Sequence, residues 1–185
     1  MSRITIPDGA REIIDTLTSA GFEAYVVGGC VRDSLLGLEP HDWDICTSAL
    51  PSDVMSIFSE KRIIGTGMKH GTVTILTDSG GYEVTTFRID GDYSDHRRPD
   101  SVTFTTSLDE DLSRRDFTIN AMAYNDAVGL IDPFGGISSL CNREILLTDL
   151  RKMHFASCGL SVLHPHTGSV SKIERQKRFI CSLQA

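Results

Sequence analysis

Two aspartates one residue apart, Asp42 and Asp44, stand in the segment "DWDICTS", which otherwise has the pattern of a buried β-strand. Residues i and i+2 of a strand point to the same face, so both carboxylates are expected on one face of a sheet. Such a pair is costly to desolvate unless a cation lies between the charges. Mg²⁺ takes oxygen ligands, commonly a few carboxylates together with substrate phosphates. The pair is therefore a candidate metal site, although an isolated pair more often marks a turn or a solvated strand edge.

A glycine pair, Gly28 and Gly29, ends the preceding apolar run and precedes "CVRDSLL", which has the pattern of a helix. Glycines let the backbone approach a phosphate closely, and a helix N-terminus directs N–H groups at it. Arg32 in the first turn could contact the same anion, and Asp33 could cap or orient it. A tight turn with both side chains in solvent explains the glycines alone. The nearby aspartates favour a phosphate site that works with a metal.

Glu83 is a candidate third acid. It alternates with Val84 in "GYEVTTFR", so it would join the two aspartates if this strand lay beside "DWDIC". The alternative is an exposed strand residue paired with a neighbour such as Arg88. The residues alone do not favour one interpretation over the other.

The segment "SRRDFTINAMAYN" is expected to be helical and to place Asp116 and Asn120, four residues apart, on one face. An arginine beside that face, Arg114 or Arg115, could hold a ribose or a triphosphate. A solvated helix start capped by Ser113 or by Asp116 accounts for the same residues.

The elements that must position these side chains follow from periodicity and turn signals. Helix, strand, helix, strand and helix, followed by a hairpin through residues 78–81, predict an α+β fold in which helices pack on a mixed β-sheet. The polar segment 90–101 is expected to be a mobile loop, and "DPFGG" a turn. Helices are expected at 8–22, 30–36, 50–60 and within 109–125, and strands at 23–29, 42–48, 71–77, 81–89 and 101–106.

Length and composition set broader limits. A chain of 185 residues suits one globular domain with an appendage, and no apolar run approaches the ~20 residues of a membrane span. The N-terminus lacks a signal-peptide pattern, so a cytoplasmic protein without a membrane partner is expected. The five cysteines form no CxxC pair, which favours free thiols over a disulfide framework or a zinc site.

The charge is unevenly distributed. The formal net charge of −7 is unfavourable for an enzyme that binds nucleic acid, because phosphate backbones are held mainly by Lys and Arg. Residues 1–145 carry 12 basic and 23 acidic side chains, whereas residues 146–185 carry 6 and 2. Composition therefore changes near residue 146.

Taken together, these segments resemble the polymerase-β-like nucleotidyltransferases, in the branch of class II CCA-adding enzymes and bacterial poly(A) polymerases. The resemblance covers residues 5–145 with the motifs in order. "TGMKHGTVTI" resembles the CCA-adding type, because the poly(A) branch usually has a basic G-R/K-R/K-F run there. The motifs are "VVGGCVRDSLLG", "HDWDICTS", "TGMKHGTVTI", "EVTTFRIDGDYSDHRRPDSVTF", "DLSRRDFTINAMAYN" and "LIDPFGGISSL".

The resemblance implies a palm (head) domain that transfers CMP and AMP from CTP and ATP to a tRNA 3′ end, with Mg²⁺ as cofactor. It implies that Asp42 and Asp44 are catalytic metal ligands, with Glu83 as an auxiliary acid. It also implies a set of nucleotide-binding residues. Those at the triphosphate are Gly28, Gly29, Arg32 and Asp33, and those near the sugar are Arg114, Arg115, Asp116 and Asn120.

The family pattern ends near residue 145. The family continues with a helical neck whose E/D-D-x-x-R element selects the base, and then with helical tRNA-binding domains. Residues 146–185 contain no such element; Asp149 and Arg151 come nearest, at the wrong spacing. We therefore expect a head domain at 1–145 and an atypical tail at 146–185, disordered or derived from a frameshift. A poly(A) polymerase and a catalytically silent nucleotide-binding head are the alternative functions.

Overall fold

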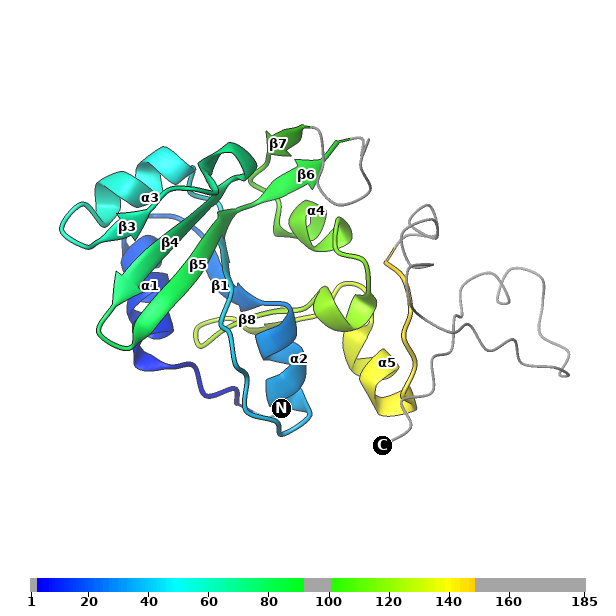
Figure 1. The fold of residues 1–185 in the computed structure, drawn as a ribbon. Helices are drawn as coiled ribbons and strands as arrows, with labels where there is room; N and C mark the ends of the chain where they lie inside the picture. Colours follow the sequence, from blue (N-terminus) through cyan, green and yellow to red (C-terminus); the bar gives the residue numbers. More distant parts are fainter. Residues whose placement is uncertain (1–2, 92–100, 149–185) are drawn as a thin grey trace, which may run out of the picture.

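The computed structural model describes residues 3–91 and 101–148, which contain a mixed β-sheet with flanking helices (Figure 1). Among these residues, seven strands form the main sheet in the order β3-β4-β5-β2-β1-β8-β9, and β6 and β7 form a second, small sheet. The strands are β1 (Ala24–Val27), β2 (Ile45–Thr47), β3 (Ile63–Ile64), β4 (Thr72–Thr77), β5 (Gly80–Thr86), β6 (Arg88–Asp90), β7 (Val102–Phe104), β8 (Ala123–Asn125) and β9 (Gly129–Ile131). The helices are α1 (Asp8–Ser19), α2 (Gly29–Leu35), α3 (Pro51–Ile57), α4 (Leu108–Ser113) and α5 (Gly136–Asn142), with 3₁₀ turns η1 (Met68–His70) and η2 (Thr118–Asn120).

Strand β1 lies inside the main sheet. It pairs antiparallel with β2 and with β8, whereas β2 pairs parallel with β5. The sheet is therefore mixed, as the sequence predicts. The predicted hairpin is also confirmed, because β4 and β5 pair antiparallel and close at Thr77 and Gly80.

Both faces of β1 are buried, which explains its uninterrupted apolar sequence AYVV. Val26 faces a large core that includes Ile13 and Leu17 of α1 and Val54 of α3. Val27 faces a smaller core on the other side of the sheet, shared with Leu112 of α4. The smaller core matters for function, because α4 leads directly into the segment that carries the two candidate arginines.

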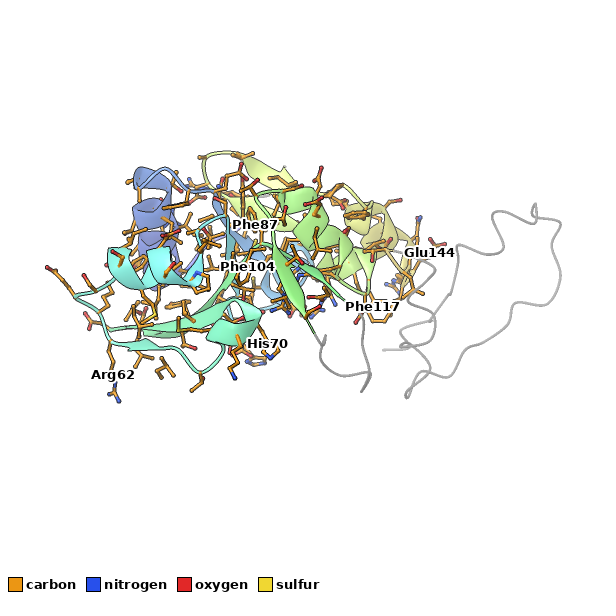
Figure 2. The ribbon with its side chains drawn as sticks, turned by 90° about the horizontal axis from the view of Figure 1, so that it is seen from above. Arg62, His70, Phe87, Phe104, Phe117 and Glu144 are labelled. Atoms are coloured by element: carbon orange, nitrogen blue, oxygen red, sulfur yellow. The ribbon has the colours of Figure 1, made fainter. Side chains whose placement is uncertain are left out.

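The predicted strand 81–89 is two strands, separated at Phe87. The Phe87 side chain is fully buried in the smaller core, and Figure 2 shows it within the body of the molecule. After Phe87 the chain leaves the main sheet and pairs as β6 with β7. The break at this buried residue brings Arg88 and Asp90 next to α4.

The prediction of a helix through the middle of 109–125 is wrong in its second half. Helix α4 ends at Ser113, Phe117 forms an isolated bridge with Leu147, and only the short η2 turn follows. Asp116 and Asn120 therefore do not share a helical face. The chain straightens here because the N–H of Thr118 donates to the carbonyl of Leu146 instead of continuing a helical ladder.

Other predictions fall partly outside the described residues. Most of the expected mobile loop and most of the atypical tail lie in 92–100 and 149–185. Of the five cysteines, the structure describes Cys30, Cys46 and Cys141, all free thiols. None of the helices in residues 3–91 and 101–148 combines the length and apolar character needed to cross a bilayer.

Candidate nucleotide-binding site

The two aspartates lie just before β2, and the predicted strand 42–48 is shortened to Ile45–Thr47. Asp44 nevertheless stays aligned with the sheet, because the N–H of Val27 donates to the Asp44 carbonyl at 3.0 Å. Val27 is the last residue of β1 and directly precedes Gly28. This hydrogen bond therefore places the acidic segment beside the glycine turn.

Asp42 and Asp44 are both exposed to solvent. The protein around Asp44 still desolvates its carboxyl group in part, and this raises its pKa above the ordinary value. The Arg115 guanidinium acts in the opposite direction, and the negative charge of Asp42 raises the Asp44 pKa further. Asp44 thus interacts electrostatically with one nearby cation and one nearby anion, as expected for a residue at a cation- and phosphate-binding site.

Gly28 has φ of 82° and ψ of −130°, a conformation that glycine adopts without the strain that a side chain would add. Its N–H donates to the carbonyl of Met122 at 3.2 Å, which fixes the turn against the segment before β8. A Cβ atom at Gly28 would lie 3.2 Å from Nη1 of Arg115, and one at Gly29 would lie 3.6 Å from Nη2 of Arg32. Two guanidinium groups therefore lie against the glycine turn.

Arg32 connects α2 to η2. Its Nη1 donates to Oδ1 of Asn120 at 2.6 Å, and its Nε donates to Oδ1 of Asp33 at 2.8 Å. The Arg32 side chain is 30% exposed, so it is held in place by two acceptors and still reaches solvent. Asn120 thus reaches the candidate site by contacting Arg32, and not through a helical face shared with Asp116.

Arg114 and Asp116 are placed differently. The Arg114 guanidinium is largely buried against Asp111 and Asp90, so it points into the protein. Asp116 is exposed, and its backbone carbonyl accepts a hydrogen bond from the N–H of Thr148 at 3.0 Å.

Glu83 lies in the strand next to the aspartates. The parallel register pairs Ile45 of β2 with Val84 of β5, so one residue earlier Asp44 is level with Glu83. Within the described part of the chain, however, no three His, Cys, Asp or Glu side chains form a group able to hold a metal ion. The register thus agrees with the adjacency considered from the sequence, but the three acids do not converge into one ligand set.

Asp111 is a residue of this region that sequence reasoning missed. It is fully buried on α4 and bonds both candidate arginines, Arg114 and Arg115. The spacings i+3 and i+4 to these arginines would have indicated the contacts. The sequence interpretation instead considered a solvated helix start capped by Ser113 or Asp116 and did not consider Asp111.

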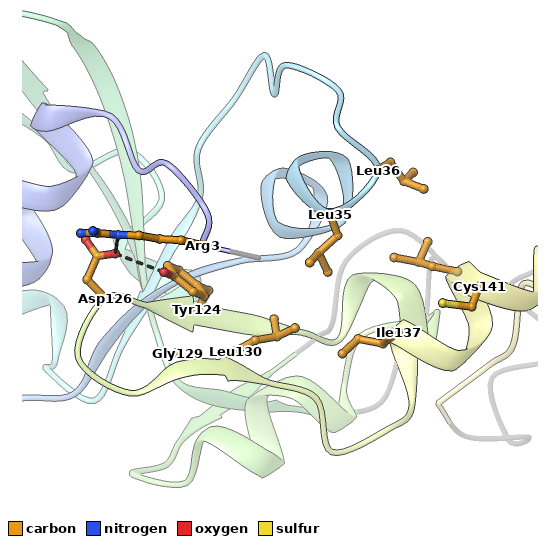
Figure 3. A pocket seen from close by; sticks show the side chains of 10 residues that line it. Arg3, Leu35, Leu36, Tyr124, Asp126, Gly129, Leu130, Ile137 and Cys141 are labelled. Atoms are coloured by element: carbon orange, nitrogen blue, oxygen red, sulfur yellow. Dashed lines mark hydrogen bonds and ion pairs between the residues drawn. The ribbon is translucent and has the colours of Figure 1, made fainter. Parts of the chain in front are cut away.

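A separate hollow of about 800 Å³ lies between the end of α2, the β8–β9 hairpin and α5 (Figure 3). Leucines and Ile137 supply much of its lining, and Arg3, Asp126 and Tyr124 interact at one end. None of the site residues predicted from the sequence lines it. The candidate site is therefore the glycine turn with its arginines and the adjacent acids.

A family model described as "Poly A polymerase head domain" matches residues 24–146. The chain belongs to this family. The match includes the glycine turn, both aspartates and the segment from Asp111 to Asn120, so the family resemblance and the α+β fold inferred from the sequence are confirmed.

Relatives named CCA-adding enzyme align with most of the chain. That of Latilactobacillus sakei subsp. sakei (strain 23K) is 58% identical over 136 residues, which are 74% of this chain and 34% of that protein. That of Geobacillus thermodenitrificans (strain NG80-2) is 57% identical over 74% of this chain and 33% of the relative. The chain spans about a third of the length of the curated relatives it matches.

Solved structures agree with this assignment. The CCA-adding enzyme of Bacillus stearothermophilus in complex with CTP is 47% identical, with a TM-score of 0.70 over 82% of this chain and 35% of that chain. The Thermotoga maritima CCA-adding enzyme complexed with tRNA is 26% identical, with a TM-score of 0.63. The alignment covers 80% of this chain and 34% of that chain. The mixed sheet with flanking helices is thus the head-domain fold of these enzymes.

Proposed function

We propose that this protein is the head domain of a CCA-adding tRNA nucleotidyltransferase, which transfers CMP and AMP from CTP and ATP to a tRNA 3′-hydroxyl. One observation carries the proposal: the guanidinium groups of Arg32 and Arg115 lie against the Gly28–Gly29 turn, and the adjacent strand end carries Asp44. Two cations beside a glycine turn suit a triphosphate. A protein acting on tRNA in this way would work in the cytoplasm.

Asp42 and Asp44 fit a divalent cation. Burial is the main cause of the raised pKa of Asp44, and the charge of Asp42 raises it further. A metal ion between the two carboxylates would relieve their repulsion. Two carboxylates with substrate phosphates and water suit Mg²⁺, which rarely depends on a complete protein cage. When bound, Mg²⁺ supplies charge neutralisation at the triphosphate and activation of the attacking hydroxyl. Glu83, level with Asp44 in the sheet, is proposed as an auxiliary acid.

The chain's own residues would position the nucleotide. Gly28 and Gly29 would let the phosphates approach the backbone, and Arg32 would neutralise them while Asp33 and Asn120 orient its guanidinium. Arg115 at the turn is proposed to contact the phosphates and the sugar, and the exposed Asp116 the sugar. Arg114, proposed from the sequence for the sugar side, is held by Asp111 and Asp90 and would support this segment from within the protein. We propose residues 1–145 as the head domain and 146–185 as an atypical tail, whose first residues, 146–148, contact residues 116–118 of the head.

Two alternative functions are compared with CCA addition, namely a poly(A) polymerase and a catalytically silent nucleotide-binding head. The resemblance of "TGMKHGTVTI" to the CCA-adding type and the names of the relatives disfavour a poly(A) polymerase. A catalytically silent nucleotide-binding head is compatible with the same comparisons, in which the chain spans about a third of its relatives' length. That alternative uses the same binding residues and differs only in turnover.

Primer extension tests the proposal. The full chain is incubated with Mg²⁺ and labelled CTP or ATP, using tRNA that lacks its CCA end and, separately, an unrelated RNA. CMP addition restricted to the tRNA supports the CCA-adding function, and AMP addition to the unrelated RNA identifies a poly(A) polymerase. Binding of Mg²⁺–CTP without addition identifies a silent head. A chain that neither adds nucleotides nor binds Mg²⁺–CTP would contradict the proposal. So would an Asp42→Ala variant that adds nucleotides at the wild-type rate.

A further inference from the structure

Asp111 has no exposed surface, although it is ionisable. Its Oδ1 accepts from Nε of Arg114 at 2.8 Å and from the backbone N–H of Arg88 at 3.2 Å, and its Oδ2 accepts from Nη2 of Arg115 at 3.4 Å. A carboxylate is buried to this degree only when it is paired and hydrogen-bonded. Asp111 therefore depends on these donors, and they depend on it.

Asp111 belongs to a charged cluster of three arginines and two aspartates. Arg88 donates through Nε to Oδ1 of Asp90 at 3.0 Å, and Nη1 of Arg114 lies 3.6 Å from Oδ2 of Asp90. Burial alone would lower the pKa of Arg114, but the charges of Asp111 and Asp90 outweigh burial and raise it. The cluster, defined as Arg88, Asp90, Asp111, Arg114 and Arg115, thus joins β6 to α4 and to the segment that follows α4.

Arg115 connects this cluster to the glycine turn. Its Nη2 bonds Asp111, while its Nη1 lies 3.2 Å from the position that a Cβ of Gly28 would occupy. The two nitrogens belong to one planar group, so fixing one restricts the other. The buried Asp111 therefore restricts where the Arg115 guanidinium lies at the turn.

We propose that Asp111 is a positioning residue for nucleotide binding: it orients Arg115 so that the guanidinium faces the phosphates and sugar of a nucleotide held at Gly28–Gly29. The inference rests on the proposed function for its ligand, a nucleoside triphosphate. Its structural part, the orientation of Arg115 by Asp111, is independent of that function. Asp111 itself touches no substrate.

The experiment uses Asp111→Asn in the full chain. This change keeps the shape and one acceptor oxygen but removes the charge that binds the arginines. The order of the Arg115 side chain is measured without nucleotide, from the ¹⁵Nε relaxation of its guanidinium, with the signal assigned by Arg115→Lys. Affinity for Mg²⁺–CTP is then measured by titration calorimetry.

We expect the Arg115 signal to become mobile and the affinity for Mg²⁺–CTP to fall about tenfold or more, the usual effect of losing a hydrogen bond to a charged group. In the Arg115→Lys background the same substitution should change affinity by less than about twofold, because neighbouring residues that act together are not additive. The matched control is Asn125→Ala on β8, another buried polar residue, whose side chain bonds Ala24 and Val128. The control should lose stability and keep nucleotide affinity.

An Arg115 side chain that stays ordered in Asp111→Asn would overturn the inference. So would unchanged affinity, or an equal loss of affinity in Asn125→Ala, which would indicate general destabilisation. A wild-type chain that binds no nucleotide would overturn the proposed function instead. The two failures are distinguishable because the order of Arg115 is read without any nucleotide.

Discussion

The backbone of Asp44 is hydrogen-bonded to the backbone of Val27, with the Val27 nitrogen and the Asp44 carbonyl oxygen 3.0 Å apart. Val27 precedes the glycine turn, and Asp44 is the second acid of the candidate metal pair. One backbone hydrogen bond thus fixes the spacing between the segment proposed to hold phosphates and the segment proposed to hold metal. The side chains around it determine what the arrangement binds.

Gly28→Ala should impair both folding stability and nucleotide binding. The positive φ of 82° disfavours any residue with a Cβ, and the added atom would lie 3.2 Å from Nη1 of Arg115. We expect a loss of about 1–3 kcal/mol in the free energy of unfolding and a clear loss of Mg²⁺–CTP affinity. Denaturant titration and calorimetry measure the two effects.

The matched control for Gly28→Ala is Gly21→Ala. Gly21 has φ of 90°, but a Cβ there would meet no atom within 4 Å. This variant should lose stability and retain affinity. Equal losses of affinity in the two variants would show that strain alone, and not the contact with Arg115, weakens binding.

Arg32 and Asn120 should act as a unit in nucleotide binding. Arg32→Lys removes the planar group that bonds Asn120 and Asp33, and Asn120→Ala frees the guanidinium to turn away. Each substitution should weaken Mg²⁺–CTP binding, with a coupling energy of about 0.5–2 kcal/mol in the double variant. Arg11→Lys is the control, because Arg11 pairs with Asp126 elsewhere on the molecule. Strictly additive effects would argue against a shared role.

Mg²⁺ should stabilise the folded protein through the acidic pair. A Mg²⁺ concentration ten times the dissociation constant adds about 1.4 kcal/mol, or about 3–6 °C in Tm for a domain of this size. Asp42→Asn combined with Asp44→Asn should abolish the shift, and should raise Tm without metal because the repulsion between the two carboxylates is removed. Differential scanning calorimetry measures both effects.

The control for the metal experiment uses a second acidic location. Asp8 and Asp78 line another hollow, between α1 and the β4–β5 turn. Asp8→Asn combined with Asp78→Asn should leave the Mg²⁺ shift intact. Loss of the shift in this control would indicate nonspecific binding to an acidic surface.

Alkaline pH should destabilise the protein through Tyr25. Burial, and then the charge of Glu23, raise the pKa of Tyr25 to about 12 in the folded state, against 10.0 for an ordinary tyrosine. The unfolded chain therefore loses this proton first, so the stabilisation is complete below pH 10 and is lost as the pH rises from 10 to 12. The loss should reach at most about 3 kcal/mol, because each unit of pKa difference corresponds to about 1.4 kcal/mol. Denaturant titration at pH 8 and pH 11 measures the free energy of unfolding, which should decrease less in Tyr25→Phe than in the wild type. An identical decrease in both proteins would show that Tyr25 is not the cause of the alkaline destabilisation.

Local pattern was enough to predict much of the fold. The amphipathic spacing of Ile13, Ile14 and Leu17 predicted α1, and all three are buried. The turn residues 78–81 predicted the β4–β5 hairpin. The family motifs supplied the fold class. These features depend on neighbours in sequence, which is why one sequence was sufficient.

Other features depend on contacts between distant residues. The break at Phe87 requires the smaller core around Leu112, and the irregular backbone after Ser113 requires the bond from Thr118 to Leu146. The contact of Asn120 with Arg32 joins residues 88 positions apart. Helical periodicity considers only near neighbours in sequence, so it placed Asn120 beside Asp116 and did not predict the contact with Arg32. The roles of the individual site residues, Glu83 included, stay predictions.

The position of β1 between β2 and β8 has a consequence for synthesis on the ribosome. Its partner β8 begins almost a hundred residues later, at Ala123. The N–H of Gly28 likewise cannot form its hydrogen bond until Met122 has been synthesised. Chain growth is slow compared with local collapse, so a nascent chain exposes one edge of an apolar strand until that distant segment emerges. The glycine turn is therefore translated well before the segment that completes its hydrogen bonds, and it reaches its final form late.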